Sequence, residues 1–154
     1  MPTQIESIIQ DWERAKLGAQ DYIDAMPEDK FHFQPVPEVL SFAGQFLHIA
    51  HANYMFAAAL GAVSPLKDEP ADKNPDLQTK AAVKDYTLTS YDYLLAGIKA
   101  LDASKLDEEV TLFRWTMPRS GVVAKALEHQ VHHSGQAVVY IRLQGIKPPN
   151  ERLF

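Results

Sequence analysis

The sequence contains no cysteine among its 154 residues. Disulfide bonds, thiolate metal sites and a cysteine nucleophile are therefore excluded. Any metal ion bound by this chain must be held by nitrogen and oxygen ligands. A sulfur nucleophile, if the chemistry needs one, would have to arrive as part of a cosubstrate.

An excess of positive charge is also missing, since the formal net charge is −5 and the pI is about 5.6. This disfavours general nucleic-acid binding, which needs a basic face to neutralise phosphates. No apolar signal core opens the chain. The longest mostly apolar stretch, 39–63, is interrupted by polar side chains and is a poor lipid-facing span. These side chains are Gln45, His48, His51 and Asn53. We expect a cytoplasmic protein that binds neither nucleic acid nor membrane.

Apolar residues recur at helical spacing in four segments, which predicts an all-α four-helix bundle in one domain spanning 1–154. The helices are expected at about 5–26, 77–101 and 120–144, with Ser120 as the N-cap of the last, and one more begins near Glu38 or Ser41 and ends at about 60. The connection 62–76 holds three prolines and should be the longest, mobile loop. Residues 110–115 alternate in polarity and indicate a short extended piece. The long connections on either side of the third helix allow one crossover.

The third helix is expected to bury one apolar stripe along its whole length. The members of this stripe are Leu77, Ala81, Lys84, Leu88, Tyr91, Leu95 and Ile98.

Two histidines, His129 and His133, are four residues apart in the last expected helix. This spacing places both imidazoles on one face, with Cβ atoms about 6 Å apart, so that both can reach one ion. Gln130 replaces the glutamate of the HExxH pattern, which disfavours a metalloprotease. Both histidines lie on the apolar stripe, where buried imidazoles need partners. A metal ion, or hydrogen bonds to other helices, would supply them.

His48 is the best candidate for a third ligand, because it lies beside the apolar stripe of a facing helix. His51 is expected to support a ligand or to be exposed, since a fourth protein ligand would leave no position for substrate. His132 points about 60° away from the direction between His129 and His133 and is expected at the surface. The sequence thus predicts a three-histidine site for a divalent metal ion in the bundle interior. Zinc, nickel and iron are the expected metals.

Three segments together resemble the DinB/YfiT-like superfamily of candidate metalloenzymes. Residues 26–54 contain a proline-bearing link, a serine and a helix with one histidine. HQVHHSGQ at 129–136 is close to HxxxHRGQ, and YIRLQGIKPP at 140–149 is similar to YLRxxGxxPP. The resemblance spans nearly the whole chain. It implies a four-helix bundle, commonly dimeric, with metal ligands at His48, His129 and His133. Ser134 departs from the pattern, because arginine is common at its position.

Some members of that superfamily are thiol-dependent S-transferases, and one is a mycothiol-dependent isomerase. The resemblance therefore implies a metal-dependent enzyme acting on a small-molecule substrate, with a low-molecular-weight thiol as cosubstrate and a homodimeric assembly. A related hydrolase is a further option. The alternative is a non-catalytic metal- or ligand-binding bundle used in stress response or sensing.

Four other side chains could contribute to such a site, although each also has an ordinary structural role. Gln136 could orient a ligand or pack as a polar core residue. Tyr54 and Tyr140 could line the cavity or belong to the core. Arg142 could hold an anionic group or form a salt bridge.

Overall fold

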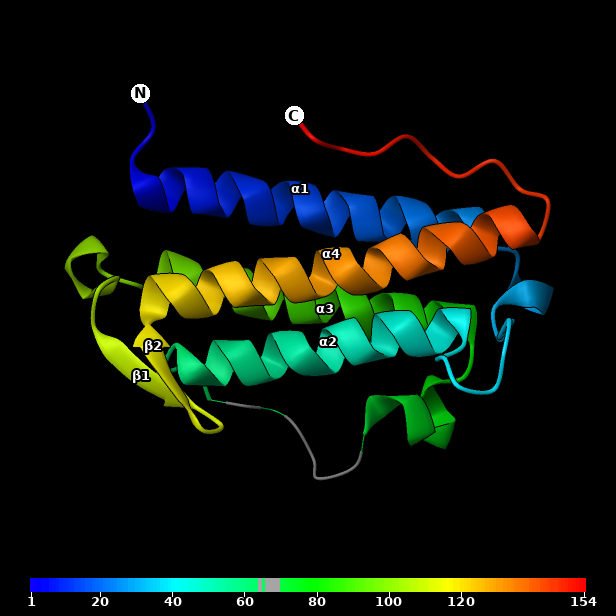
Figure 1. Ribbon diagram of the computed structural model, residues 1–154, viewed down its shortest axis with the longest axis horizontal. Coiled ribbons are helices and arrows are strands. Elements are labelled where there is room, and N and C mark those ends of the chain that lie inside the picture. The colour runs from blue at the N-terminus through cyan, green and yellow to red at the C-terminus, as the bar shows by residue number, and fades with distance from the viewer. Residues whose placement is uncertain (64, 66–69) are drawn as a thin grey trace.

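The computed structural model describes residues 1–63, 65 and 70–154, and within them four α-helices form a bundle (Figure 1). The helices are α1 (Gln4–Ala25), α2 (Phe42–Ala59), α3 (Lys80–Lys99) and α4 (Arg119–Leu143). A small antiparallel hairpin, β1 (Glu109–Leu112) and β2 (Trp115–Pro118), precedes α4. The predicted all-α four-helix bundle is thereby confirmed. None of the helices in the described residues is long and apolar enough to cross a membrane.

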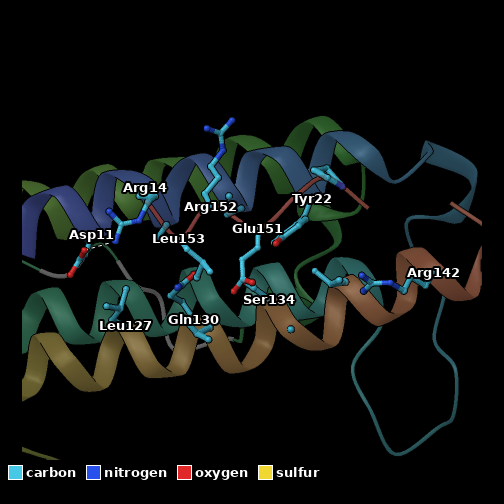
Figure 2. Close-up of a pocket in the computed structure, with 17 residues that line it drawn as sticks. Asp11, Arg14, Tyr22, Leu127, Gln130, Ser134, Arg142, Glu151, Arg152 and Leu153 are labelled. Atoms are coloured by element: carbon cyan, nitrogen blue, oxygen red, sulfur yellow. Dashed lines mark hydrogen bonds and ion pairs between the residues drawn. The ribbon is translucent and has the colours of Figure 1, made fainter. Parts of the chain in front are cut away.

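The chain after α4 turns at Gly145, whose φ of 75° is readily adopted by glycine, and then returns along α1. Arg152 of this tail forms an ion pair with Asp21 of α1. Tail residues 149 and 151–153 help to line a cavity of about 460 Å³ between α1 and α4 (Figure 2).

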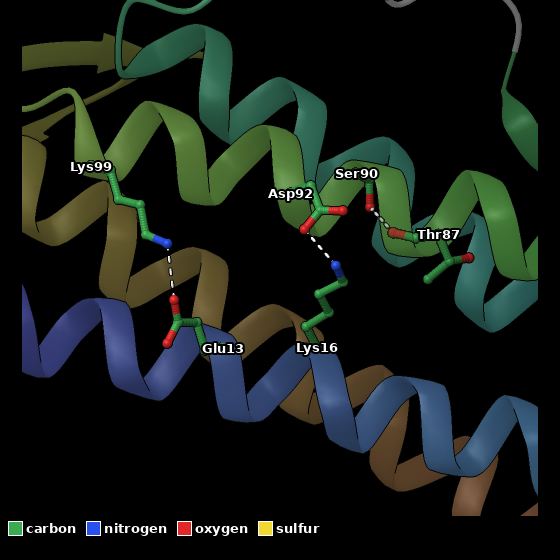
Figure 3. A network of polar contacts seen from close by, with 6 residues as sticks. All are labelled: Glu13, Lys16, Thr87, Ser90, Asp92 and Lys99. Carbon is green, nitrogen blue, oxygen red and sulfur yellow. Dashed lines mark hydrogen bonds and ion pairs between the residues drawn. The ribbon is translucent and has the colours of Figure 1, made fainter.

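Ion pairs show that α1 and α3 run in opposite directions. Glu13, in the first half of α1, pairs with Lys99 at the end of α3, and Lys16, further along α1, pairs with Asp92, which is earlier in α3 (Figure 3). Exposed pairs of this kind each contribute only about 0–1 kcal/mol to stability. They therefore mark the register of the two helices more than they stabilise it.

Hydrogen bonds show that α2 and α3 run in the same direction. The Thr87 hydroxyl donates to the carbonyl oxygen of Phe46, and further along both helices the Asn53 amide donates to Ser90. The chain must therefore cross back along the length of the bundle between the end of α2 and the start of α3. This is the crossover connection that the sequence allowed. The expected mobility of 62–76 falls partly outside the described residues. Its described part contains single 3-10 turns at Ala71–Lys73 and Pro75–Leu77.

The register predicted for α3 is right in its second half and wrong in its first. Tyr91 and its apolar successors are buried as expected, but Ala81 is exposed and Val83 is buried instead. Between them the buried face continues through Thr87 and Ser90. These polar residues can occupy the core because their hydroxyls have hydrogen-bond partners. An apolar stripe could not reveal them.

The predicted start of α4 at a Ser120 N-cap is wrong. The helix begins at Arg119 with Pro118 in the N-cap position, and no side chain caps it. The backbone N–H of Arg119 donates to Glu108, and that of Ser120 donates to Leu106. Backbone carbonyl oxygens before the hairpin thus accept from N–H groups in the first turn of α4, which is the role that a capping side chain would otherwise have.

The alternating residues 110–115 form more than the single extended piece that was expected. They run from β1 through the turn to the first residue of β2, with Leu112 opposite Trp115. Phe113 in the turn has a φ of 56°, which is uncommon for a residue other than glycine. Phe113 and Trp115 are both exposed.

Candidate metal centre

His48 of α2 and His129 and His133 of α4 come together on one side of the bundle. Each offers one ring nitrogen, and the three nitrogens all lie within 4.8 Å of one another. The Nε2 atoms of His48 and His129 are 3.1 Å apart. Nitrogens that bind one ion at about 2.0–2.1 Å are themselves roughly 3 Å apart, so this separation suits a shared metal ion. The structure therefore contains a histidine group that could hold a metal.

The helices position these side chains through their core-facing neighbours. In α2, Phe46 and Ile49 are fully buried and set the orientation of the helix, which turns His48 outward toward α4. In α4, the four-residue spacing stacks His129 and His133 on one face. Because α2 and α4 are antiparallel, His48 lies opposite this pair, while Gln45, one turn earlier in α2, reaches residues further along α4.

The expected interior location of this group needs correction. His48 is exposed, and His129 and His133 are only partly buried. The histidines lie where α2 and α4 meet at the surface, because the fully apolar faces of these helices are used by the core. An ion held there would have positions open to solvent, as catalytic sites require.

The surroundings of the three histidines lower the pKa of each imidazole and so favour its neutral form. The pKa of His129 is lowered to about 4, mainly by burial and next by His48. The pKa of His133 is also lowered to about 4, mainly by burial and next by His129. Although His48 is exposed as a residue, partial desolvation of its ring lowers its pKa as well, and Asp72 opposes this shift. Near neutral pH the imidazoles therefore keep free lone pairs, which metal binding needs.

Gln45 is a site residue that the sequence reasoning did not identify. The Nδ1 atom of His133 lies 2.7 Å from the side-chain oxygen of Gln45. The Gln45 amide nitrogen in turn donates to Tyr140 and Gln136. The available signal was a polar residue in an apolar stretch, one helical turn before His48. Gln136 and Tyr140 thus contact Gln45 and help to hold its side chain in place.

The two remaining histidines of these helices stand apart from the group of three. His51 is half-buried, and its Nδ1 atom is buried without a hydrogen-bond partner among the described residues. Its charge would lower the pKa of His48. His132 is exposed, as expected from its position on the helix, with its ring centroid 5.0 Å from that of His133.

Tyr54 and Arg142 lie away from the histidine group. The Tyr54 ring packs against Tyr86 and Tyr93 of α3, and burial is the main cause that raises its pKa to about 12. Arg142 lines the cavity between α1, α4 and the tail (Figure 2), and the salt bridge expected for it is not formed with any described residue. None of the three histidines lines that cavity, although Gln130 and Ser134 do.

Comparisons with known proteins agree with this architecture. A family model described as the DinB superfamily matches residues 12–137. The uncharacterized protein YjoA of Bacillus subtilis is 26% identical over 127 residues, which cover 79% of each chain.

Solved structures show the same fold at lower identity. A DinB-like protein from Bacillus cereus superposes with a TM-score of 0.81 at 20% identity, covering 94% of this chain and 95% of that one. The structure of YjoA from Bacillus subtilis gives a TM-score of 0.73 at 22% identity, covering 95% and 98%. A conserved protein from Enterococcus faecalis gives 0.76 at 18%, covering 93% and 98%. With most of its length matched by the family model, the chain belongs to the DinB superfamily.

Proposed function

We propose that this protein is a divalent-metal-dependent enzyme with His48, His129 and His133 as its ligands. The observation that carries the proposal is the convergence of three ring nitrogens within 4.8 Å from two different helices. Zinc, nickel and iron all suit such an all-imidazole donor set. The lowered pKa values of the three histidines support it, because they keep the donors unprotonated.

The proposed reaction transfers a small-molecule thiol or water to an electrophile. A divalent ion bound here would lower the pKa of a coordinated thiol or water and could polarise the electrophile. The chain has no cysteine, so the thiol must be a low-molecular-weight cosubstrate. The exposed position of His48 favours access for such a molecule.

Elemental analysis tests the metal centre directly. Protein purified without a histidine tag and without chelator should contain about one equivalent of zinc, nickel or iron, as expected for a single site. His48→Ala should lose this metal, while His132→Ala, the matched control, should keep it. Absence of metal from the wild type even after reconstitution would contradict the proposal.

Turnover separates an enzyme from a binding module. The metal-loaded protein should consume a low-molecular-weight thiol together with an alkylating electrophile, or hydrolyse that electrophile, faster than the His48→Ala variant does. Stoichiometric metal without any turnover would instead support the non-catalytic metal- or ligand-binding module.

A further inference from the structure

Gln45 is a fully enclosed polar side chain that contacts one of the three histidines. It lies in the first half of α2 with 1% of its surface exposed. A buried amide needs hydrogen-bond partners on both its oxygen and its nitrogen. Gln45 finds all of them on α4, which makes it the main polar link between the two helices that carry the histidines.

The oxygen of this amide faces the Nδ1 atom of His133 at 2.7 Å. An amide oxygen only accepts hydrogen bonds, so Nδ1 must carry the ring proton in this contact. The lone pair of the neutral imidazole is then on Nε2. The ring of His133 also lies against those of His48 and His129, with centroids 4.5 and 4.6 Å away.

The nitrogen of the same amide is held from the other side. It donates to the Tyr140 hydroxyl at 3.1 Å and to the Gln136 oxygen at 3.2 Å. Tyr140 is buried, and both acceptors lie on α4 beyond His133. The bonds to these two acceptors hold the amide nitrogen on the far side and therefore keep the amide oxygen directed at His133. The opposite amide orientation would place a donor at Nδ1 and move the ring proton to Nε2.

We propose that Gln45 is a positioning residue that holds His133 in its Nδ1–H form and so presents Nε2 to the metal centre. Metal-binding histidines usually have such a partner on the second ring nitrogen, which sets the tautomer and ring orientation. His129 differs, since its Nδ1 is buried with no hydrogen-bond partner among the described residues. His133 is thus the anchored member of the group. The consequence for metal binding rests on the proposed function, whereas the tautomer does not.

The test is nitrogen-15 NMR of the histidine rings in metal-free protein, where the chemical shifts distinguish the two tautomers. The wild type should show the His133 proton on Nδ1. Gln45→Leu should lose that preference, because leucine is of similar size but cannot accept the bond. Gln130→Leu is the matched control, since Gln130 is a buried glutamine of α4 that bonds Tyr91 instead. It should leave the His133 tautomer unchanged.

Metal affinity provides a second readout. Gln45→Leu should weaken binding of added Zn²⁺ by about 10- to 100-fold, while Gln45→Glu, which keeps an acceptor oxygen, should retain binding. A His133 proton on Nε2 in the wild type, or an unchanged tautomer in Gln45→Leu, would overturn the proposal. If the leucine variant fails to fold, Gln45→Glu and the wild type still decide it. A correct tautomer in a protein that binds no metal would contradict the proposed function alone.

Discussion

The Nε2 atoms of His48 and His129 lie 3.1 Å apart, although the two residues are 81 positions apart in the chain. Two neutral imidazoles at this distance must share a proton or direct their lone pairs at a common partner. A divalent ion satisfies both nitrogens at once. Their juxtaposition depends on the antiparallel arrangement of α2 and α4, and it is the basis of the predictions for the site.

Removing either histidine of α4 should abolish metal retention. His129→Ala or His133→Ala leaves two imidazoles, which is below the three protein ligands usual in an open metal site. His132→Ala should keep the metal because its exposed ring belongs to another face of α4. Inductively coupled plasma mass spectrometry of the three variants measures this. Loss of metal from His132→Ala as well would refute the assignment of faces.

Metal-free protein should lose stability as the pH falls from about 6.5 to about 4. The folded-state pKa of His129 and of His133 is about 4, against an unfolded value of 6.5. The unfolded chain therefore binds more protons in this window, so the free energy of unfolding declines as the pH drops. Above 6.5 these groups exert their full stabilising effect, and below 4 their effect no longer changes.

Thermal melts across this pH range can isolate the contribution of the two histidines. The double variant His129→Gln/His133→Gln should show a weaker dependence of Tm on pH than the wild type does. His132→Gln serves as an exposed control and should follow the wild type. Parallel curves for the double variant and the wild type would be inconsistent with depressed pKa values at the site.

Ser41 and Ser120 offer a matched pair for testing the corrected helix boundaries. The Ser41 hydroxyl accepts from the backbone N–H of Gly44 at 3.0 Å, which makes it the N-cap of α2. Ser41→Ala should lower the free energy of unfolding by about 1 kcal/mol. Ser120→Ala, within the first turn of α4, should change it by less than about 0.5 kcal/mol. Urea denaturation measures both free energies of unfolding. If Ser120→Ala were the more destabilising of the two, the corrected start of α4 would be wrong.

Ser90 should be required for the packing of α2 against α3. Its hydroxyl accepts from the Asn53 amide. It also donates to the Thr87 carbonyl oxygen, and this second bond is drawn in Figure 3. Ser90→Ala leaves the buried Asn53 amide without this partner and should cost about 1–3 kcal/mol of stability. The exposed neighbour Thr89→Ala is the control. Equal denaturation midpoints for both variants would contradict the stabilising role assigned to Ser90.

Much of the helical architecture can be predicted from local patterns. Apolar spacing located α1, α2 and the second half of α3, whereas the structure decided between Glu38 and Ser41 for the start of α2. The first half of α3 was misplaced because Thr87 and Ser90 are buried through hydrogen bonds with α2, which no local pattern shows. The start of α4 was misplaced because backbone carbonyls outside the helix serve its first donors.

The sequence by itself determined that His129 and His133 share a helical face, since that relationship follows from a four-residue spacing alone. It also determined that any metal must be held without a cysteine thiolate. Only the tertiary structure decided that the α2–α4 contact brings His48 to that face, that the site lies at the surface, and that Gln45 supports His133. These are relationships across about 80–95 residues, and they depend on helix direction and register, which are set by the packing of whole helix faces.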